Sequence, residues 1–254
     1  MSDHTGGALP VVAALAASAQ ARRSWVTAAA RVLSVDQRVR GVWLVGSLSH
    51  GRGDAFSDVD LIVVAGEPVP ADLRDDPFAG LRMPGTVLYA RRKPRNAPAG
   101  GGYLAVCLDM AGLPVLVDMY LWPVTTAVLP AGGNVLFHRG EVIRSTRGLL
   151  EVLAACPADD PAGADPTDPV SVFFLIQLAA KYHARADHSR YAGICRQLRI
   201  PADDFRALRL LLAGCSLSTE PGVTRAVERL LDVADEHRRL LEPASVSSSA
   251  KEGS

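Results

Sequence analysis

The strand-like segments of this chain are confined to its first 140 residues, and helical patterns dominate the remainder. Short runs rich in Val, Leu, Ile and aromatic residues, bounded by Gly or Pro, are typical of buried strands. Such runs occupy residues 39–45, 59–64, 86–90, 103–110, 113–121 and 134–137. The first forty residues look helical, with Ser24 as the expected cap of a run that reaches Leu33. Strands interspersed with helices predict an α/β (α+β) fold built on a mixed β-sheet.

The composition of the chain changes near residue 156. The next segment includes four prolines and several aspartates, which is typical of a linker. Beyond it apolar residues recur at helical spacing, and Pro201 and Pro221 stand where helices commonly begin. A C-terminal α-helical bundle is therefore expected after an α/β core. The predicted boundaries are 1–155 for the core, 156–169 for the linker, 170–242 for the bundle and 243–254 for a disordered, Ser-rich tail.

The charge balance restricts the classes of partner. The chain has 27 basic and 27 acidic residues, so it lacks the basic excess of a protein that coats nucleic acid or an anionic membrane. Its most apolar early stretch, residues 9–17, follows Asp3 and no Lys or Arg, which argues against a signal peptide. The four cysteines form no CxxC pair. These features predict a cytoplasmic protein with reduced thiols and no membrane-spanning segment.

The most informative stretch joins the first two predicted strands. The strand over residues 39–45 ends at Gly46-Ser47, and the next strand begins with Asp58-Val59-Asp60. A Gly at a strand end lets another group approach the backbone closely, and the turn amides with the Ser47 hydroxyl can cradle a phosphate. Because side chains alternate along a strand, the two aspartates share one face while Val59 points into the core.

Two carboxylates on one strand face repel each other unless a cation lies between them. Mg²⁺ is the usual partner, because it prefers carboxylates, phosphate oxygens and water. Asp118 stands in an otherwise apolar run, 115–121, where a lone charge is costly without a partner. If that strand lies beside Asp58-Val59-Asp60, the three carboxylates form a two-metal site for Mg²⁺, with Mn²⁺ as an alternative. Asp109, in the neighbouring strand, is the rival to Asp118.

These residues resemble the signature of the nucleotidyltransferase superfamily with the DNA polymerase β-type core. The family pattern is an apolar residue, Gly, then Gly or Ser, a spacer, Asp-x-Asp or Asp-x-Glu, and a third carboxylate on a distant strand. The matching residues here are Val45-Gly46-Ser47, Ser57-Asp58-Val59-Asp60-Leu61 and Asp118. The resemblance covers roughly residues 25–145. Beyond it, the helical C-terminal layout is similar to that of aminoglycoside and lincosamide nucleotidyltransferases.

The resemblance implies roles for individual residues. The implied catalytic and metal-binding residues are Asp58, Asp60 and Asp118, and the implied nucleotide-binding residues are Gly46, Ser47, Ser57 and Lys181. In kanamycin-type enzymes a helix carries a Glu base one turn before such a Lys. Here Gln177 stands at that position and cannot take a proton, so the base is Asp118 or another carboxylate. His50 stands where many members carry Arg, which leaves its role open.

The expected activity is Mg²⁺-dependent transfer of a nucleoside monophosphate from a nucleoside triphosphate to a hydroxyl of a small molecule, with release of pyrophosphate. The acceptor would be an aminoglycoside- or lincosamide-like antibiotic or a related metabolite. Two alternatives stay open: nucleotidylylation of a protein or RNA, as in toxin–antitoxin systems, and a binding module whose site has decayed. Residues 170–242 hold 11 basic and 9 acidic residues, too balanced for a phosphate track, so nucleic acid is disfavoured. The expected assembly is a monomer or a homodimer.

Overall fold

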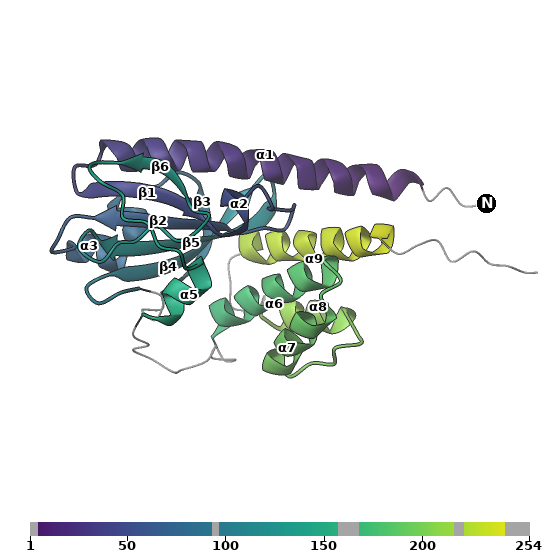
Figure 1. Cartoon of the computed structure of the whole chain (residues 1–254). Helices are drawn as coiled ribbons and strands as arrows, with labels where there is room; N and C mark the ends of the chain where they lie inside the picture. Colours follow the sequence, from purple (N-terminus) through teal and green to yellow (C-terminus); the bar gives the residue numbers. More distant parts are fainter. Residues whose placement is uncertain (1–4, 93–96, 157–167, 216–220, 242–254) are drawn as a thin grey trace, which may run out of the picture.

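The structure, a computed structural model, describes residues 5–92, 97–156, 168–215 and 221–241 (Figure 1). The strands are β1 (Val39–Val45), β2 (Val59–Ala65), β3 (Thr86–Arg92), β4 (Gly102–Met110), β5 (Leu113–Pro123) and β6 (Asn134–His138). They form one sheet in the order β3-β4-β5-β2-β1-β6. β2 and β5 run parallel, and every other neighbouring pair is antiparallel. Each predicted run is therefore a strand, and the mixed α/β class with a mixed sheet is confirmed.

Nine helices accompany the sheet within the described residues. They are α1 (Thr5–Val35), α2 (Gly46–Ser49), α3 (Ala71–Asp75), α4 (Pro77–Gly80), α5 (Leu149–Ala154), α6 (Pro169–Ala184), α7 (His188–Leu198), α8 (Arg206–Cys215) and α9 (Pro221–Leu241). None of these helices is both long enough and apolar enough to cross a membrane. Residues 157–167 of the predicted linker and the predicted tail, 243–254, lie outside the described residues.

The alternation of side chains along β2 and β5 separates the two faces of the sheet. Their odd-numbered residues, such as Leu61 and Met119, join one buried cluster with Trp25, Ala29 and Leu33 of α1. α1 lies along this face and extends past the sheet toward α9, as the purple ribbon in Figure 1 shows. The spacing of its buried residues explains the contact, because positions four apart share one face of a helix.

The even-numbered residues of β2 and β5 face the other way. Ile62 and Trp122 lie in a second buried cluster, to which α5 contributes Val152. Asp60 and Asp118 also stand at even positions, so the pleat of the two strands directs both carboxylates toward this second face.

The helices α6 to α9 pack against one another and against the sheet. A third apolar cluster joins Leu116 of β5 to Ile176 of α6. A fourth joins Leu15 of α1 to Val233 of α9 through Leu113 of β5. The helical part of the chain therefore shares its hydrophobic interior with the sheet and is held against it by burial of apolar surface.

Two helix starts differ from the sequence-based prediction. Ser24 does not cap a helix but lies inside α1, because the earlier half of that helix is buried against α9 and is helical as well. Pro201 does not begin α8. The side chain of Asp204 accepts a hydrogen bond from the backbone N–H of Arg206 at 2.9 Å, which satisfies an orphan donor and starts the helix there. Pro221 begins α9 as predicted.

Candidate functional site

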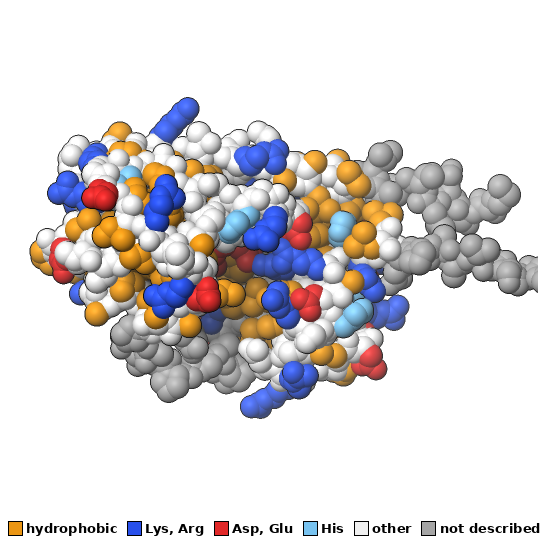
Figure 2. Space-filling model, in the orientation of Figure 1, with side chains coloured by type: hydrophobic (Ala, Val, Ile, Leu, Met, Phe, Trp, Pro, Cys, Tyr) orange, Lys and Arg blue, Asp and Glu red, His pale blue; other side chains and the backbone are white. Residues whose placement is uncertain are grey.

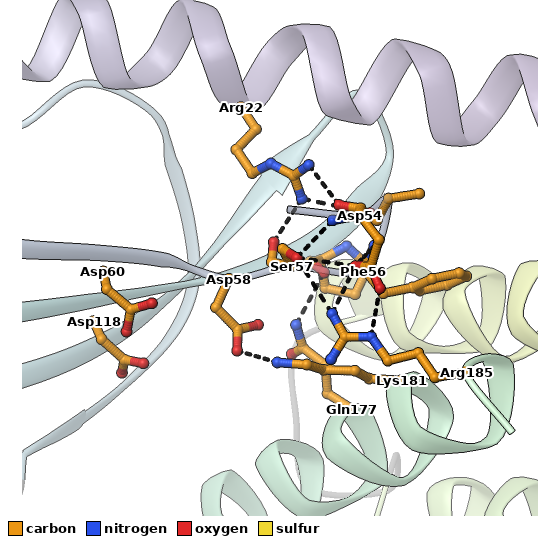
Figure 3. Close-up of polar contacts among 12 residues, drawn as sticks. Arg22, Asp54, Phe56, Ser57, Asp58, Asp60, Asp118, Gln177, Lys181 and Arg185 are labelled. Carbon is orange, nitrogen blue, oxygen red and sulfur yellow. Dashed lines mark hydrogen bonds and ion pairs between the residues drawn. The ribbon is translucent and has the colours of Figure 1, made fainter. Parts of the chain in front are cut away.

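Two carboxylates meet at the parallel strand pair inside the sheet. The register of β2 and β5 places Asp60 directly beside Asp118, and Figure 3 shows the two side chains turned the same way. Asp109 lies at the far end of β4, where its Oδ1 accepts a hydrogen bond from the N–H of Gly112 at 2.6 Å. Of the two predicted candidates for a third carboxylate, the structure thus brings Asp118, and not Asp109, to Asp60.

The backbone at Gly46 passes directly against the Asp60 carboxylate. β1 pairs with β2 so that Val45 lies opposite Asp60, and Gly46 follows with a φ of 71°. A Cβ atom at this position would collide with Oδ2 of Asp60. Glycine is therefore needed here for two reasons, its left-handed backbone and the close approach of the carboxylate. This is the physical basis of the Gly in the Gly46-Ser47 pair.

Burial and mutual repulsion weaken the acidity of the paired carboxylates. Burial, followed by the charges of Asp118 and Asp58, raises the pKa of Asp60 above its ordinary value. Burial and the charge of Asp58 also raise the pKa of Asp118, which the hydroxyl of Tyr103 opposes by donating to its Oδ1 at 2.6 Å. The hydroxyl of Tyr120 lies 3.5 Å from Oδ1 of Asp60, at the limit of a hydrogen bond. A cation between these groups would favour their ionised forms.

Asp58 faces a lysine of the helical part. It immediately precedes β2, and its Oδ2 forms an ion pair with Nζ of Lys181 on α6 (Figure 3). Both side chains are largely buried, with exposed fractions of 21% for Asp58 and 13% for Lys181. The ammonium also opposes the rise in the pKa of Asp60 and of Asp118. Lys181 is therefore the counter-cation of an acidic cluster.

A cleft of about 810 Å³ opens above these carboxylates, between the sheet and the helical part. Its charged lining consists of the basic side chains Arg52, Lys181, Arg185 and Arg190 and the acidic side chains Asp54, Asp58, Asp60, Asp118 and Glu151. Figure 2 shows blue side chains gathered over red ones in the hollow at the centre of the molecule. Cations that face carboxylates across a cleft suit a polyanion that binds together with divalent cations.

The two predicted nucleotide-binding serines have different surroundings. Ser47 is exposed and lines the cleft. Ser57 also borders the cleft but is only 3% exposed, and its hydroxyl is engaged with Asp54. It accepts a hydrogen bond from the N–H of Asp54 and donates one to Oδ1 of the same residue, each at 2.9 Å. This geometry favours support of the loop before Asp58 over contact with a nucleotide.

Gln177 is a structural residue of the contact between α6 and the sheet. Its side chain is buried, and Oε1 accepts hydrogen bonds from the hydroxyl of Tyr89 at 2.6 Å and the thiol of Cys107 at 3.3 Å. Its Nε2 donates to the carbonyl oxygen of Pro114 at 2.9 Å. A neutral amide satisfies this pattern, because it both accepts and donates. His50 is exposed at the cleft, with Nδ1 2.8 Å from a backbone carbonyl oxygen of α2.

The sequence-based prediction omitted the arginines of the cleft and the tyrosines beside the carboxylates. Arg185 follows Lys181 by one helical turn, so its spacing was a usable signal. Tyr120 stands two residues after Asp118 on the same strand face, which alternation also indicates. Nothing in the sequence separates Arg190 from the many other arginines of the chain.

The donor set fits a hard divalent cation. Asp60 and Asp118 present carboxylate oxygens from adjacent strands, and Asp58 adds a third carboxylate just before β2. Such oxygens are the ligands that Mg²⁺ prefers. Within the described residues, no three His, Cys, Asp or Glu side chains converge closely enough to hold one metal ion as they stand. The side chain of Asp58 is turned toward Lys181, with which it forms an ion pair, and away from Asp60 and Asp118 (Figure 3). The predicted face shared by Asp58 and Asp60 is therefore not seen here, because Asp58 precedes β2.

Comparison with known proteins gives no family assignment. No protein-family model matches the sequence, and no curated protein is significantly similar to it. The interpretation of the site therefore depends on its residues and their geometry.

Proposed function

We propose that the protein is a Mg²⁺-dependent nucleotidyltransferase that moves a nucleoside monophosphate from a nucleoside triphosphate to a hydroxyl of a small molecule. One observation carries the proposal. Asp60 and Asp118 lie side by side on parallel strands, against the backbone of Gly46, in a cleft whose opposite wall is basic. Nucleotidyl transfer needs this combination, because metal-ligating carboxylates and phosphate-binding cations must face one substrate.

The metal would be held by Asp58, Asp60 and Asp118. When bound, Mg²⁺ or Mn²⁺ supplies Lewis-acid stabilisation of charge on the transferred phosphate and makes a ligated hydroxyl more acidic. Asp58 must release Lys181 before its Oδ2 can serve as a ligand. The released ammonium is then available to the phosphates, so the lysine changes its anionic partner as the substrate binds.

The basic wall of the cleft would hold the triphosphate. Lys181 and Arg190 reach the cleft from α6 and α7, and Arg52 reaches it from the loop after α2. Ser47 adds an exposed hydroxyl at the end of β1. These groups place the triphosphate and neutralise the charge that develops on the leaving pyrophosphate, so catalysis consists mainly of positioning and charge stabilisation.

Asp118 is the proposed general base for the acceptor hydroxyl. Burial raises the pKa of Asp118 in the absence of metal, and a bound cation would lower it again, so the carboxylate would act as a weak general base. The 2.6 Å hydrogen bond from Tyr103 fixes its orientation. Among the described residues, the cleft-lining side chains that α6 and α7 contribute are all basic. These helices therefore offer no carboxylate to replace the Glu base of kanamycin-type enzymes.

The charges of the cleft favour an acceptor with at most one positive charge. Of the five acidic side chains that line it, three are the proposed metal ligands and Asp54 is paired with Arg185. Among the described residues that line the cleft, Glu151 of α5 is the remaining carboxylate that could face the acceptor. Leu150, 79% exposed, adds apolar surface beside it. A molecule that combines hydroxyls with one amine and an apolar group fits this wall better than a polycationic amino sugar.

The test is a panel of acceptors incubated with the protein, Mg²⁺ and each nucleoside triphosphate. Lincomycin supplies one amine and an alkyl tail, kanamycin supplies a polycation, and ribitol supplies a neutral polyol. Pyrophosphate release and the mass of the acceptor are measured. We expect acceptor-dependent pyrophosphate release, fastest with lincomycin, and a mass gain of one nucleoside monophosphate. Release of nucleoside diphosphate in place of pyrophosphate would contradict nucleotidyl transfer.

A further inference from the structure

The loop between α2 and β2 ends in a closed turn directly before Asp58. Asp54 and Ser57 exchange two hydrogen bonds of 2.9 Å through the backbone N–H and Oδ1 of Asp54 and the hydroxyl of Ser57. The N–H of Phe56 donates to the same Oδ1 at 3.0 Å. Because Asp58 is the next residue, this turn sets the direction in which its side chain leaves the backbone.

A buried arginine of α1 holds this turn by its carbonyl oxygens. Arg22 is 4% exposed, and its guanidinium donates to the carbonyl oxygen of Ser57 at 2.5 Å and to that of Asp54 at 2.8 Å (Figure 3). Two parallel donors on one rigid plane fix both carbonyl groups at once, which a flexible ammonium cannot do. Burial of a charged guanidinium costs free energy. We therefore attribute to Arg22 a specific use, which is to fix these two carbonyl groups.

A second arginine holds the turn from the side of the helical part. Arg185, at the end of α6, binds the carboxylate of Asp54 through Nε and Nη2, each at 2.6 Å. It lies one helical turn beyond Lys181, so the helix that supplies the lysine is also tied to the turn. The turn is therefore clamped between α1 and α6.

We infer that Arg22 is a positioning residue of the metal site. It fixes the turn of residues 54–57 and thereby places the carboxylate of Asp58 for a divalent cation, without contacting the substrate. This role rests on the proposed function, because it concerns the ligand set of the proposed metal. The buried guanidinium also adds positive charge near the carboxylates of Asp54 and Asp58.

Mn²⁺ binding in the absence of substrate tests the role independently of activity. Electron paramagnetic resonance measures the affinity of the wild type, of Arg22→Lys and Arg22→Met, and of Arg23→Met as a control. Arg23 is the adjacent residue, and its guanidinium donates to Oε1 of Gln20 at 2.6 Å on the surface of α1. We expect Arg22→Lys to weaken Mn²⁺ binding by about 10-fold or more, the usual loss for an outer partner of a metal ligand.

A second readout reports the turn itself. Hydrogen exchange of the amides of residues 54–58 should be faster in Arg22→Lys than in the wild type and unchanged in Arg23→Met, because the lysine cannot hold both carbonyl groups. If Arg22→Met fails to fold, Arg22→Lys, which keeps the charge, carries the test alone.

The outcomes separate the inference from the proposed function. Wild-type Mn²⁺ affinity and wild-type exchange in folded Arg22→Lys would overturn the positioning role and leave the proposed function standing. A wild-type protein that binds no Mn²⁺ would contradict the proposed metal site, and the positioning role with it.

Discussion

Gly46 and Gly51 both adopt a positive φ, 71° and 66°, but they differ in what surrounds them. A Cβ at Gly46 would meet the Asp60 carboxylate, whereas one at Gly51 would point into open space. Gly46→Ala should therefore displace Asp60 and lower turnover by at least about 100-fold, since small misplacements of reacting groups are costly. Gly51→Ala should carry only the strain of the left-handed backbone, about 1–2 kcal/mol of stability. Steady-state kinetics of the two variants measure the difference, and equal losses would assign the effect to backbone strain.

Asp60 also predicts a pH dependence of stability. Burial raises its pKa in the folded state above the unfolded value. The contribution of such a group is present at low pH and is lost as pH rises through the folded pKa. Asp60→Asn removes the charge, so in metal-free protein near pH 8 it should raise the free energy of unfolding by about 1 kcal/mol or more, roughly 2–4 °C in Tm. The gain should shrink toward pH 4, while transfer activity is abolished.

The matched control for this prediction is Asp109→Asn, which changes an exposed carboxylate of the same sheet. It should leave both turnover and the pH dependence of Tm close to those of the wild type, because Asn can still accept the hydrogen bond from Gly112. Thermal unfolding followed by circular dichroism at several pH values makes the comparison. A metal-free Asp60→Asn that is less stable than the wild type near pH 8 would refute the repulsion among these carboxylates.

Single residues were predictable from the sequence where strand geometry fixes them. Alternation places Asp60 on its face of β2, and the cost of a lone charge singles out Asp118. Alternation does not fix Asp58, because this residue precedes β2 and its carboxylate pairs with Lys181. Arg22 was not predictable, because it reaches the site from α1, and only the tertiary structure determines how that helix packs. Its side chain binds the carbonyl groups of a turn, not a motif residue, so no local pattern marks it.

At the scale of elements, α6 is attached to the sheet through Gln177. This amide has three buried partners, so Gln177→Ala should lower stability by about 1–3 kcal/mol for the unpaired groups it leaves. Turnover of the folded variant should fall less than tenfold, since the residue faces the sheet. Gln177→Glu should be less stable still, because its charge would face the carbonyl oxygen of Pro114. Urea unfolding and kinetics measure the two effects, and a 100-fold loss of turnover in stable Gln177→Ala would place the residue in the reaction.

The elements themselves differ in how far sequence patterns determine them. The predicted strands are confirmed, because short runs rich in β-branched residues and bounded by Gly or Pro rarely form another secondary structure. α1 begins earlier than its cap signal at Ser24 indicates, since Val11 and Leu15 gain their apolar partners from α9 and β5. The sequence predicts the helical character of the first forty residues. A contact between α1 and α9 has no local sequence signature, so the sequence does not show that one helix continues through Ser24.

At the scale of the whole molecule, the sheet and the helices α6 to α9 share buried clusters, which join Leu116 to Ile176 and Leu113 to Val233. We therefore expect one cooperative thermal transition, with a calorimetric enthalpy equal to the van't Hoff enthalpy. Differential scanning calorimetry at several scan rates measures both quantities. Two resolved transitions would show that the helical part unfolds independently and that the shared clusters contribute little to stability.

The cleft is a property of the whole molecule, and this limits what the sequence can predict. Change of composition near residue 156 indicates two parts, but not how they face each other. That orientation follows from the apolar clusters between sheet and helices, and it brings Lys181 to Asp58 across 123 positions of the chain. The sequence therefore does not predict which charged side chains line the cleft together, because they come from both parts of the chain.

The central claim is that the cleft transfers a nucleotidyl group, and the fate of the individual phosphates tests it most directly. The protein is given Mg²⁺, the best acceptor of the panel, and triphosphate labelled at either the α or the γ phosphorus. We predict that the α label moves to the acceptor, that the γ label leaves as pyrophosphate, and that Asp60→Asn does neither. A γ label found on the acceptor, or undiminished α transfer by Asp60→Asn, would contradict the account.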